Sequence, residues 1–367
     1  MQWSLDAIRA ETDAPVVAVI YTHSHYVGGT SAIAGAGDTV PVWGHERIVV
    51  NRERTGVELS ASASRGAVHQ FGMLLDHEGP DGLINVGLGQ SFRRADHAPH
   101  TFGFVEPTEI VRGPVTTTIA GLTVEITPAP SDADDSVTLW FPELSTCVHN
   151  IAWPVLFNVF AIRGEEYRDP RVLLTGLDHL LGLGAEHLVG AHGTPVSGAA
   201  DLAREVTLDR AAIQFLWDQT LRGVNKDLTG AQLAAAVQLP DVYADGLLTR
   251  QLYGVAEHHV RQIHAGVVGW FDGDEAQLFP LPPADRAKRL IAGFGGVDAV
   301  RAEVRSAIDA DELRWAVEMG SWLARRDDPE DEDRRLLAEA IRTIGQRTTA
   351  ANIRNWCITR ARELEGS

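Results

Sequence analysis

The feature that most constrains this chain is a pair of histidines placed directly after an apolar strand. Residues 16–20 are all apolar and predict a buried parallel strand, and His23 and His25 follow it. Because a turn breaks the alternation of a strand, both imidazoles can face one cation. Two glycines at 28–29 allow a sharp reversal into a helix expected over residues 30–36. The sequence therefore predicts a metal site at the carboxyl end of a strand, where open α/β sheets place their sites.

Strand patterns alternate with helical patterns as far as residue 198, and only helical patterns follow. Strands are predicted at residues 16–21, 40–43, 115–119, 122–126, 137–141 and 187–190. Helices are predicted at 4–12, 170–181, 205–224, 229–237, 247–265 and 283–293. Four more, at 297–307, 310–324, 332–345 and 350–364, are spaced like tetratricopeptide hairpins. We therefore expect an α/β domain at 1–198 and an all-α domain at 199–367.

Composition excludes several classes of partner. The formal net charge of −18 repels nucleic acid and anionic membranes alike. No apolar stretch reaches the ~20 residues that span a bilayer, and the first residues lack the basic and apolar parts of a secretory signal. Cys147 and Cys357 are far apart and imply no disulfide framework. We expect a cytoplasmic protein with no nucleic-acid or membrane partner.

Several further segments share the order and spacing of one known family. They lie at residues 60–66, 71–72, 79–82, 87–89, 157–164, 168–170, 191–195 and 269–273. With the histidine turn, they resemble the metallo-β-lactamase superfamily and, within it, the linear (SDS-type) alkylsulfatase family with its dimerisation domain. The resemblance implies an α/β αββα sandwich, reduced at its N-terminus because little precedes the histidine turn, followed by an all-α dimerisation domain. It also implies a homodimer.

The resemblance assigns metal ligands, and the chain departs from some of them. In the family an Asp-His pair lies between the histidine pair and the two glycines, and here both residues are missing. The family histidines that remain are His23, His25 and His192. Three histidines suit one zinc with an open fourth position. Two family glutamates are also absent, the first falling on Ser131 or Asp132 and the second on Asn150. Replacement ligands are sought among their neighbours, which are Asp132, Asp134, Asp135 and His149. We expect one zinc per chain rather than two, with iron or manganese as alternatives.

The resemblance further implies an anion-binding pair. In the family an Asn and an Arg hold the sulfate oxygens, and they match Asn158 and Arg163, with Tyr26 as a further candidate. Arg offers a planar fork that fits a tetrahedral oxyanion, while the alternative is an Arg163 paired with Glu165 or its neighbour Glu166. We expect an ion pair between Arg168 and Asp169 at the start of the helix that follows. His69 lies in a segment that lines the family's pocket, and structural roles are expected for the remaining histidines.

Three functions are consistent with these residues. The first is a metal-dependent hydrolase in which a metal-activated water attacks a sulfate ester or another ester. The second is a catalytically inactive relative that binds a small anionic or amphipathic ligand, and the third is a dimeric assembly protein. Retention of the three histidines with Asn158 and Arg163 favours the hydrolase, because an assembly protein needs none of them. The expected substrate is a small anionic ester.

Overall fold

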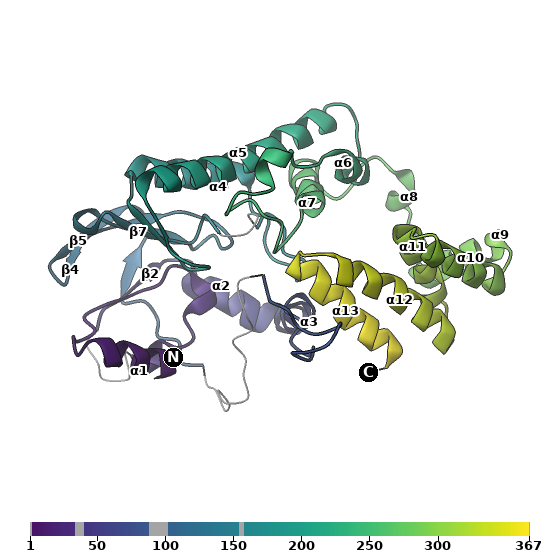
Figure 1. Cartoon of the computed structure of the whole chain (residues 1–367), viewed down its shortest axis with the longest axis horizontal. Helices are drawn as coiled ribbons and strands as arrows, with labels where there is room; N and C mark the ends of the chain where they lie inside the picture. The colour runs from purple at the N-terminus through teal and green to yellow at the C-terminus, as the bar shows by residue number, and fades with distance from the viewer. Residues whose placement is uncertain (1, 34–39, 88–101, 154–157, 367) are drawn as a thin grey trace.

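The computed structural model describes residues 2–33, 40–87, 102–153 and 158–366, with an α/β domain at one end and a series of helices at the other (Figure 1). A three-stranded parallel sheet contains, in order, β1 (Val19–Ile20), β2 (Val42–His45) and β3 (Glu109–Val111). A six-stranded sheet contains, in order, β4 (Val115–Ile119), β5 (Leu122–Pro128), β6 (Val137–Phe141), β7 (Thr146–His149), β8 (His187–Gly190) and β9 (Val196–Ser197). Its strands are antiparallel except β7 and β8, which run parallel with His149 opposite Gly190.

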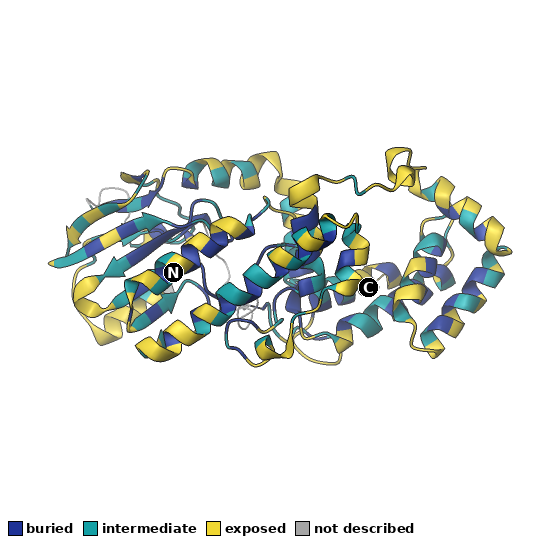
Figure 2. Cartoon of the chain, turned by 90° about the horizontal axis from the view of Figure 1, so that it is seen from above, coloured by how far each residue is buried: buried dark blue, intermediate teal, exposed yellow. Residues whose placement is uncertain are grey.

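The two sheets face each other across a shared apolar core. Val124 and Ile126 of β5 and Leu139 of β6 point inward, where Val111 of β3 meets them. Side chains alternate between the two faces of the larger sheet. On its outer face, Cys147 of β7 packs on the helices α4 (Pro170–Leu183) and α5 (Ala199–Val224). The other face of the smaller sheet packs on α2 (Ile48–Glu53). Figure 2 shows buried residues along the strands and on parts of many helices. The expected αββα order of layers is confirmed.

The remaining elements complete the two ends of the molecule. The α/β end also holds α1 (Gln2–Glu11), the 3₁₀ turns η1 (Ser24–Tyr26), η2 (Thr30–Ala32) and η5 (Pro142–Leu144), the π-helical η3 (Arg54–Glu58), and α3 (Ser60–Gln70). The helical end holds α6 (Gly230–Ala236), η6 (Asp241–Tyr243), α7 (Ala256–Val268), α8 (Glu275–Leu278), α9 (Pro283–Phe294), α10 (Val297–Asp309), α11 (Leu313–Ala324), α12 (Asp331–Arg347) and α13 (Ala351–Glu365). Helices α10 to α13 pack successively, and α13 also packs on α3 (Figure 1). Within the described residues, no helix is both long and apolar enough to cross a membrane.

Several predicted elements differ from the observed ones. The helix expected over 30–36 is only the turn η2 as far as the structure describes it, since residues 34–39 lie outside the described part. The helix expected from residue 247 begins at Ala256, because Leu247 instead donates its backbone N–H to Glu205 from an irregular segment. β1 is parallel as predicted but half-buried rather than buried, because it is the outer strand of its sheet. Helices α2 and α3 and strands β3, β7 and β9 were not predicted.

Candidate metal centre and anion pocket

The site forms where several strands end. β1 leads into His23, β7 into Asn150, and β8 into His192. Parallel β7 and β8 end at the same edge of the sheet, and antiparallel β6 begins there, after the loop of residues 130–136. Val137 donates its backbone N–H to the carbonyl oxygen of Thr22 (2.9 Å), which ties the histidine turn to that loop. Residues more than a hundred positions apart therefore meet at one edge.

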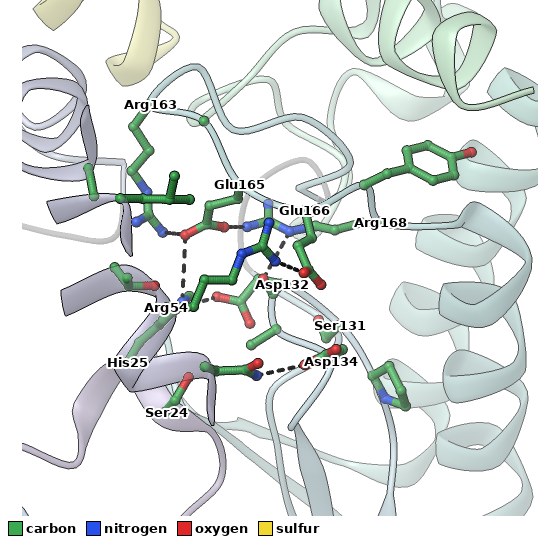
Figure 3. Close-up of a pocket in the computed structure, with 18 of the residues that line it drawn as sticks. Ser24, His25, Arg54, Ser131, Asp132, Asp134, Arg163, Glu165, Glu166 and Arg168 are labelled. Carbon is green, nitrogen blue, oxygen red and sulfur yellow. Dashed lines mark hydrogen bonds and ion pairs between the residues drawn. The ribbon is translucent and has the colours of Figure 1, made fainter. Parts of the chain in front are cut away.

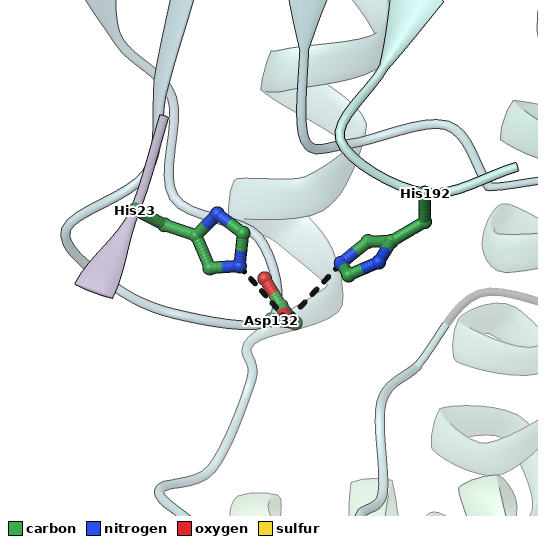
Figure 4. A group of neighbouring side chains, drawn as sticks. All are labelled: His23, Asp132 and His192. Carbon is green, nitrogen blue, oxygen red and sulfur yellow. Dashed lines mark ion pairs between the residues drawn. The ribbon is translucent and has the colours of Figure 1, made fainter. Parts of the chain in front are cut away.

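Three buried side chains at this edge form a group that can hold a metal. Ligand atoms of His23, Asp132 and His192 all lie within 4.8 Å of one another (Figure 4). Nε2 of each histidine is 3.9 Å from Oδ2 of Asp132. Nδ1 of the more exposed His25 lies 3.1 Å from the same oxygen. One carboxylate oxygen thus has three imidazoles around it, a donor set typical of zinc.

Each of the two buried histidines has one ring nitrogen without a hydrogen-bond partner in the described part of the chain. Nε2 of His23 and of His192 are buried and have no hydrogen-bond partner among the described residues. Their opposite nitrogens are engaged, since His23 Nδ1 lies 3.0 Å from the Thr22 hydroxyl and His192 Nδ1 lies 3.3 Å from the Tyr26 hydroxyl. Ring nitrogens held in this way orient the free nitrogen toward a metal. A cation placed between Asp132 and the two Nε2 atoms would give each of these nitrogens a partner, so the residues fit a metal ion.

Burial keeps the histidines in the form that binds metal. Desolvation lowers the pKa of both His23 and His192 to about 4, so both imidazoles are neutral at pH 7. Burial raises the pKa of Asp132, but His23, His25 and Arg168 outweigh that effect and hold it well below its ordinary value. The group therefore offers two neutral nitrogens and one carboxylate without releasing a proton.

The other proposed ligands take different positions. Asn150 points its side-chain Nδ2 at Asp132 and at the Ser136 hydroxyl (3.0 Å), so it presents donors on that side. Asp135 accepts hydrogen bonds from the Ser24 backbone (3.1 Å) and from the Asn51 side chain (2.9 Å). Each carboxylate oxygen of Asp135 therefore already has a donor.

Asp134 and His149 are likewise engaged elsewhere. Asp134 pairs with Arg47 and accepts from Asn51. Nδ1 of buried His149 accepts from the Ile151 backbone (3.2 Å), and desolvation lowers the pKa of His149 to about 4. The group of His23, Asp132 and His192 includes none of the four residues Asp134, Asp135, His149 and Asn150. Their roles as ligands therefore stay predictions.

A pocket of about 530 Å³ opens beside the group. Figure 3 shows Arg163, Glu165 and Arg168 along one side of the pocket, opposite His25, with Asp132 between them. Arg54 pairs with Glu166 from the other side. Asp132 and His25 therefore link the metal group to a pocket that is lined by three arginines, Arg54, Arg163 and Arg168.

Of the three predicted anion-binding residues, Arg163 lines this pocket, and Asn158 and Tyr26 do not. Arg163 pairs with Glu165, as one alternative foresaw, but its side chain is only 16% exposed and is not a surface group. Asn158 is buried, and its side-chain oxygen has no hydrogen-bond partner among the described residues. Tyr26 contacts His192 instead of lining the pocket. The structure thus brings Arg163 close to the metal group, while the roles of all three residues stay predictions.

Some residues were placed wrongly or missed. Arg168 pairs with Glu165 rather than with Asp169, which caps α4 and pairs with Arg171. Sequence reasoning gave Glu165 no role at the site beyond a possible pair with Arg163, because contacts across a loop leave no periodic signal. It also missed Gln70, whose buried side chain accepts the Arg163 backbone N–H (3.1 Å).

His69 faces away from the pocket. Its Nε2 lies 2.8 Å from Glu363 and its ring packs on Trp356, both on α13. Trp153 packs on His192 with ring centroids 4.2 Å apart. The adjoining residues 154–157 lie outside the described part, as do His97 and His100.

An αββα sandwich with a buried His/Asp group at its strand ends defines a protein of the metallo-β-lactamase type. Comparison with known proteins narrows this class. The chain is 34% identical over 371 residues to a linear primary-alkylsulfatase of Pseudomonas sp. (strain ATCC 19151), covering 99% of this chain and 69% of that protein. The chain belongs to the alkylsulfatase family.

Other relatives agree with this assignment. Alkyl/aryl-sulfatase BDS1 of Saccharomyces cerevisiae is 30% identical, with 97% of this chain and 56% of that protein covered. The solved structure of the stereoselective inverting sec-alkylsulfatase Pisa1 from Pseudomonas sp. superposes with a TM-score of 0.92 at 27% identity, covering 99% of this chain and 59% of that one. A family pattern described as alkyl sulfatase dimerisation matches residues 229–367. The predicted fold and family are confirmed, and the chain spans little more than half the length of the last two relatives.

Proposed function

We propose that the protein is a metal-dependent hydrolase of sulfate esters, with the metal held by His23, Asp132 and His192 and approached by His25. The observation that carries this proposal is the pair of buried, unpartnered Nε2 atoms, each 3.9 Å from one oxygen of Asp132. A metal bound there would supply a water whose pKa lies near 7, and hence a nucleophile at neutral pH.

The chain's own residues would orient the substrate. Arg163 lines the pocket, and the planar fork of its guanidinium matches the oxygens of a sulfate group. Asn158 would add its amide as a second donor. Tyr26 would hold the ring of His192 through the contact to Nδ1. We propose one metal rather than two, since Asn150 turns an amide donor toward Asp132 where a second metal would need an acceptor.

Zinc is the proposed metal, because a site of imidazoles and one carboxylate is typical of it, while iron and manganese are the alternatives. The test is the metal content of the full chain, purified without added metal and measured by mass spectrometry. We expect about one metal per chain, which is near zero in a His23→Ala, His192→Ala double variant. A His187→Gln variant is the matched control, since Nδ1 of His187 lies 2.8 Å from the Ser197 hydroxyl at the start of β8, the end away from His192.

Hydrolysis is tested on the same preparations with a panel of sulfate esters and with carboxylic esters as comparison. The expected result is release of sulfate by the wild type and the control but not by the double variant. Metal near zero in all three proteins would contradict the hydrolase and favour a relative that binds an anionic or amphipathic ligand without catalysis. Metal without hydrolysis of any ester would contradict the sulfatase activity alone.

We also propose a homodimer, supported by the match of residues 229–367 to the dimerisation pattern. Light scattering coupled to size exclusion measures the mass directly. Twice the 39.8 kDa of the chain is expected, and a single-chain mass at micromolar concentration would contradict the dimer. The cytoplasmic location stays a prediction.

A further inference from the structure

Glu165 occupies an unusual position at the pocket. Its carboxylate pairs with the guanidinium groups of Arg163 and of Arg168, and Oε1 lies 3.6 Å from Nε2 of His25 (Figure 3). The side chain is 17% exposed, so the carboxylate sits inside the pocket but has a path to water. One anionic group of the protein thus contacts two guanidinium groups on its own side of the pocket and the His25 imidazole opposite.

The oxygens of Glu165 take the place that a bound anion would need. Within the described part of the chain, Glu165 is the only carboxylate paired with Arg163, and Nε of Arg163 is buried with no partner. An anionic ligand that used the Arg163 fork would have to meet the same Nη2 atom that Glu165 contacts. An anionic group placed there would lie against the Glu165 carboxylate, and the repulsion between the two favours the departure of one of them.

Arg168 does not depend on this carboxylate alone. Arg168, the second partner, is also held by the carbonyl oxygens of Asp132 (2.9 Å) and Asn158 (2.8 Å), so it keeps acceptors when Glu165 departs. Gly164 precedes Glu165 with a φ of +87°, which places the side chain on a loop rather than on a helix or strand. The departing carboxylate would be hydrated at the pocket mouth.

We propose that Glu165 is a specificity-determining residue that competes with the anionic group of the substrate for Arg163. This proposal rests on the proposed function. Binding of a sulfate group displaces the carboxylate, and the carboxylate returns when the group leaves. Glu165 therefore weakens the retention of inorganic sulfate, which is the expected product, as well as of weakly held anions.

The test is titration calorimetry of the full, metal-loaded protein with sodium sulfate at constant ionic strength. Glu165→Gln keeps the size of the side chain and removes its charge, so we expect sulfate to bind at least about tenfold more tightly than to the wild type. Glu46→Gln is the matched control, because it removes the same charge from an exposed pair with Arg112 that lies outside the pocket lining. We expect the control to change the affinity by less than about threefold, since that pair is exposed and screened.

Two outcomes would overturn the competition. One is equal or weaker sulfate binding by Glu165→Gln, and the other is an equal gain in the Glu46→Gln control, which would show only a general effect of charge. A Glu165→Ala variant is titrated in parallel, so that misfolding of one variant, seen by circular dichroism, leaves the other to decide.

The result can be separated from the outcome for the sulfatase activity. If Glu165→Gln binds sulfate more tightly while no protein hydrolyses a sulfate ester, the competition stands and the sulfatase activity fails. If the wild type hydrolyses sulfate esters and Glu165→Gln shows the same sulfate affinity and the same KM, the competition fails alone. A lower KM together with stronger product inhibition in Glu165→Gln would support both.

Discussion

At the scale of single residues, the pocket and the metal group are formed by largely different side chains. Asp132 belongs to both, since it faces His23 and His192 on one side and the pocket on the other. Arg163 belongs only to the pocket. A change in Arg163 should therefore affect the recognition of a charged substrate and leave the metal in place.

Replacement of Arg163 tests this division. We expect Arg163→Met to raise KM for a sulfate ester about 10-fold to 100-fold, because a charge-assisted, forked contact is lost, with metal content unchanged. Steady-state kinetics and metal analysis of the same sample measure both. Arg204→Met is the control, since Arg204 is exposed and pairs with Asp201 outside the pocket lining. Unchanged KM for Arg163→Met would contradict an anion-binding role.

At the scale of elements, α3 lies against the segment that carries Arg163. A methyl group on Gly66 of α3 would lie 2.8 Å from Cα of Arg163 and closer still to its carbonyl oxygen, so only glycine fits there. Gln70, one turn further along the helix, accepts the Arg163 backbone N–H and donates to the Tyr253 hydroxyl (2.7 Å). The helix thus fixes the position of the pocket loop.

Substitution of this glycine should disturb the loop. We expect Gly66→Ala to lower the free energy of unfolding by about 1–3 kcal/mol, because the added methyl group overpacks the contact with Arg163. Urea denaturation followed by circular dichroism measures it. Gly56→Ala is the control, since nothing lies within 4 Å of a methyl group there, and it should be neutral or stabilise by up to about 1 kcal/mol. Equal effects of both changes would contradict the close contact.

Helix α7 approaches the same segment through His259. This buried residue accepts the Phe160 backbone N–H at Nδ1 (3.2 Å), and desolvation, with smaller effects of His258 and Arg168, lowers its pKa to about 3. The folded state therefore keeps His259 neutral, whereas the unfolded chain takes up a proton below its ordinary pKa of about 6.5. The stability that depends on neutral His259 is intact above pH 6.5 and is lost as the pH falls from there toward 3.

A variant isolates this contribution. His259→Asn keeps an acceptor but does not titrate, so the decline in the free energy of unfolding between pH 6 and pH 5 should become shallower by about 1.4 kcal/mol per pH unit. Urea denaturation at several pH values and fixed ionic strength gives the two slopes. Parallel slopes for the variant and the wild type would mean that His259 is not held neutral in the fold.

At the scale of the whole molecule, the last helix ties the two ends of the chain together. Arg354 of α13 donates to the carbonyl oxygens of Pro80 (3.0 Å) and Gly82 (2.9 Å), and Asn355 donates to that of Gln70 (3.3 Å). The C-terminal helix therefore supports α3, which in turn positions Arg163. The helical half contributes to the site as well as to the proposed dimer.

Loss of this contact should weaken the whole fold. We expect Arg354→Met to lower the free energy of unfolding by about 2–4 kcal/mol, because the buried carbonyl group of Gly82 and the partly buried one of Pro80 lose a charged donor. Arg360→Met on the outer face of the same helix should change it by less than about 0.5 kcal/mol, since that residue makes an exposed pair with Glu363. Urea denaturation of both variants, monitored by tryptophan fluorescence, compares them. Similar losses of unfolding free energy in both variants would show that any substitution in this helix lowers stability, and would contradict a specific role of the Arg354 contact.

The domain boundary also belongs to this scale. The change from mixed to helical structure falls between β9 and α5, close to residue 198, where the sequence pattern changes. Yet α5 and α7 share one apolar core with α4 and the larger sheet, through residues such as Leu177, Ile213 and Val260. Periodicity reports the secondary structure of each segment but not the surface against which it packs. The division at 198 and 199 therefore stays a proposal.

The sequence by itself determined the elements with strong periodicity, the family and most of the candidate ligands. The strands β4, β5, β6 and β8 and the helices of the tail lie where their apolar spacing placed them. His23, His25 and His192 could be found because they follow strands whose ends share an edge. These are local properties of the chain, or properties of a topology that a family resemblance supplies.

Only the tertiary structure decided which residues meet. Of several acidic neighbours, Asp132 is the one that lies between His23 and His192. The hydrogen bond from the Val137 backbone to that of Thr22 holds the loop of residues 130–136 beside the histidines. The tertiary structure also placed Glu165 against Arg163 and Arg168, and Gln70 behind Arg163. Such contacts join side chains of loops and helices that are distant along the chain or lack a repeat. Their geometry depends on how the whole fold packs, and no local pattern encodes it.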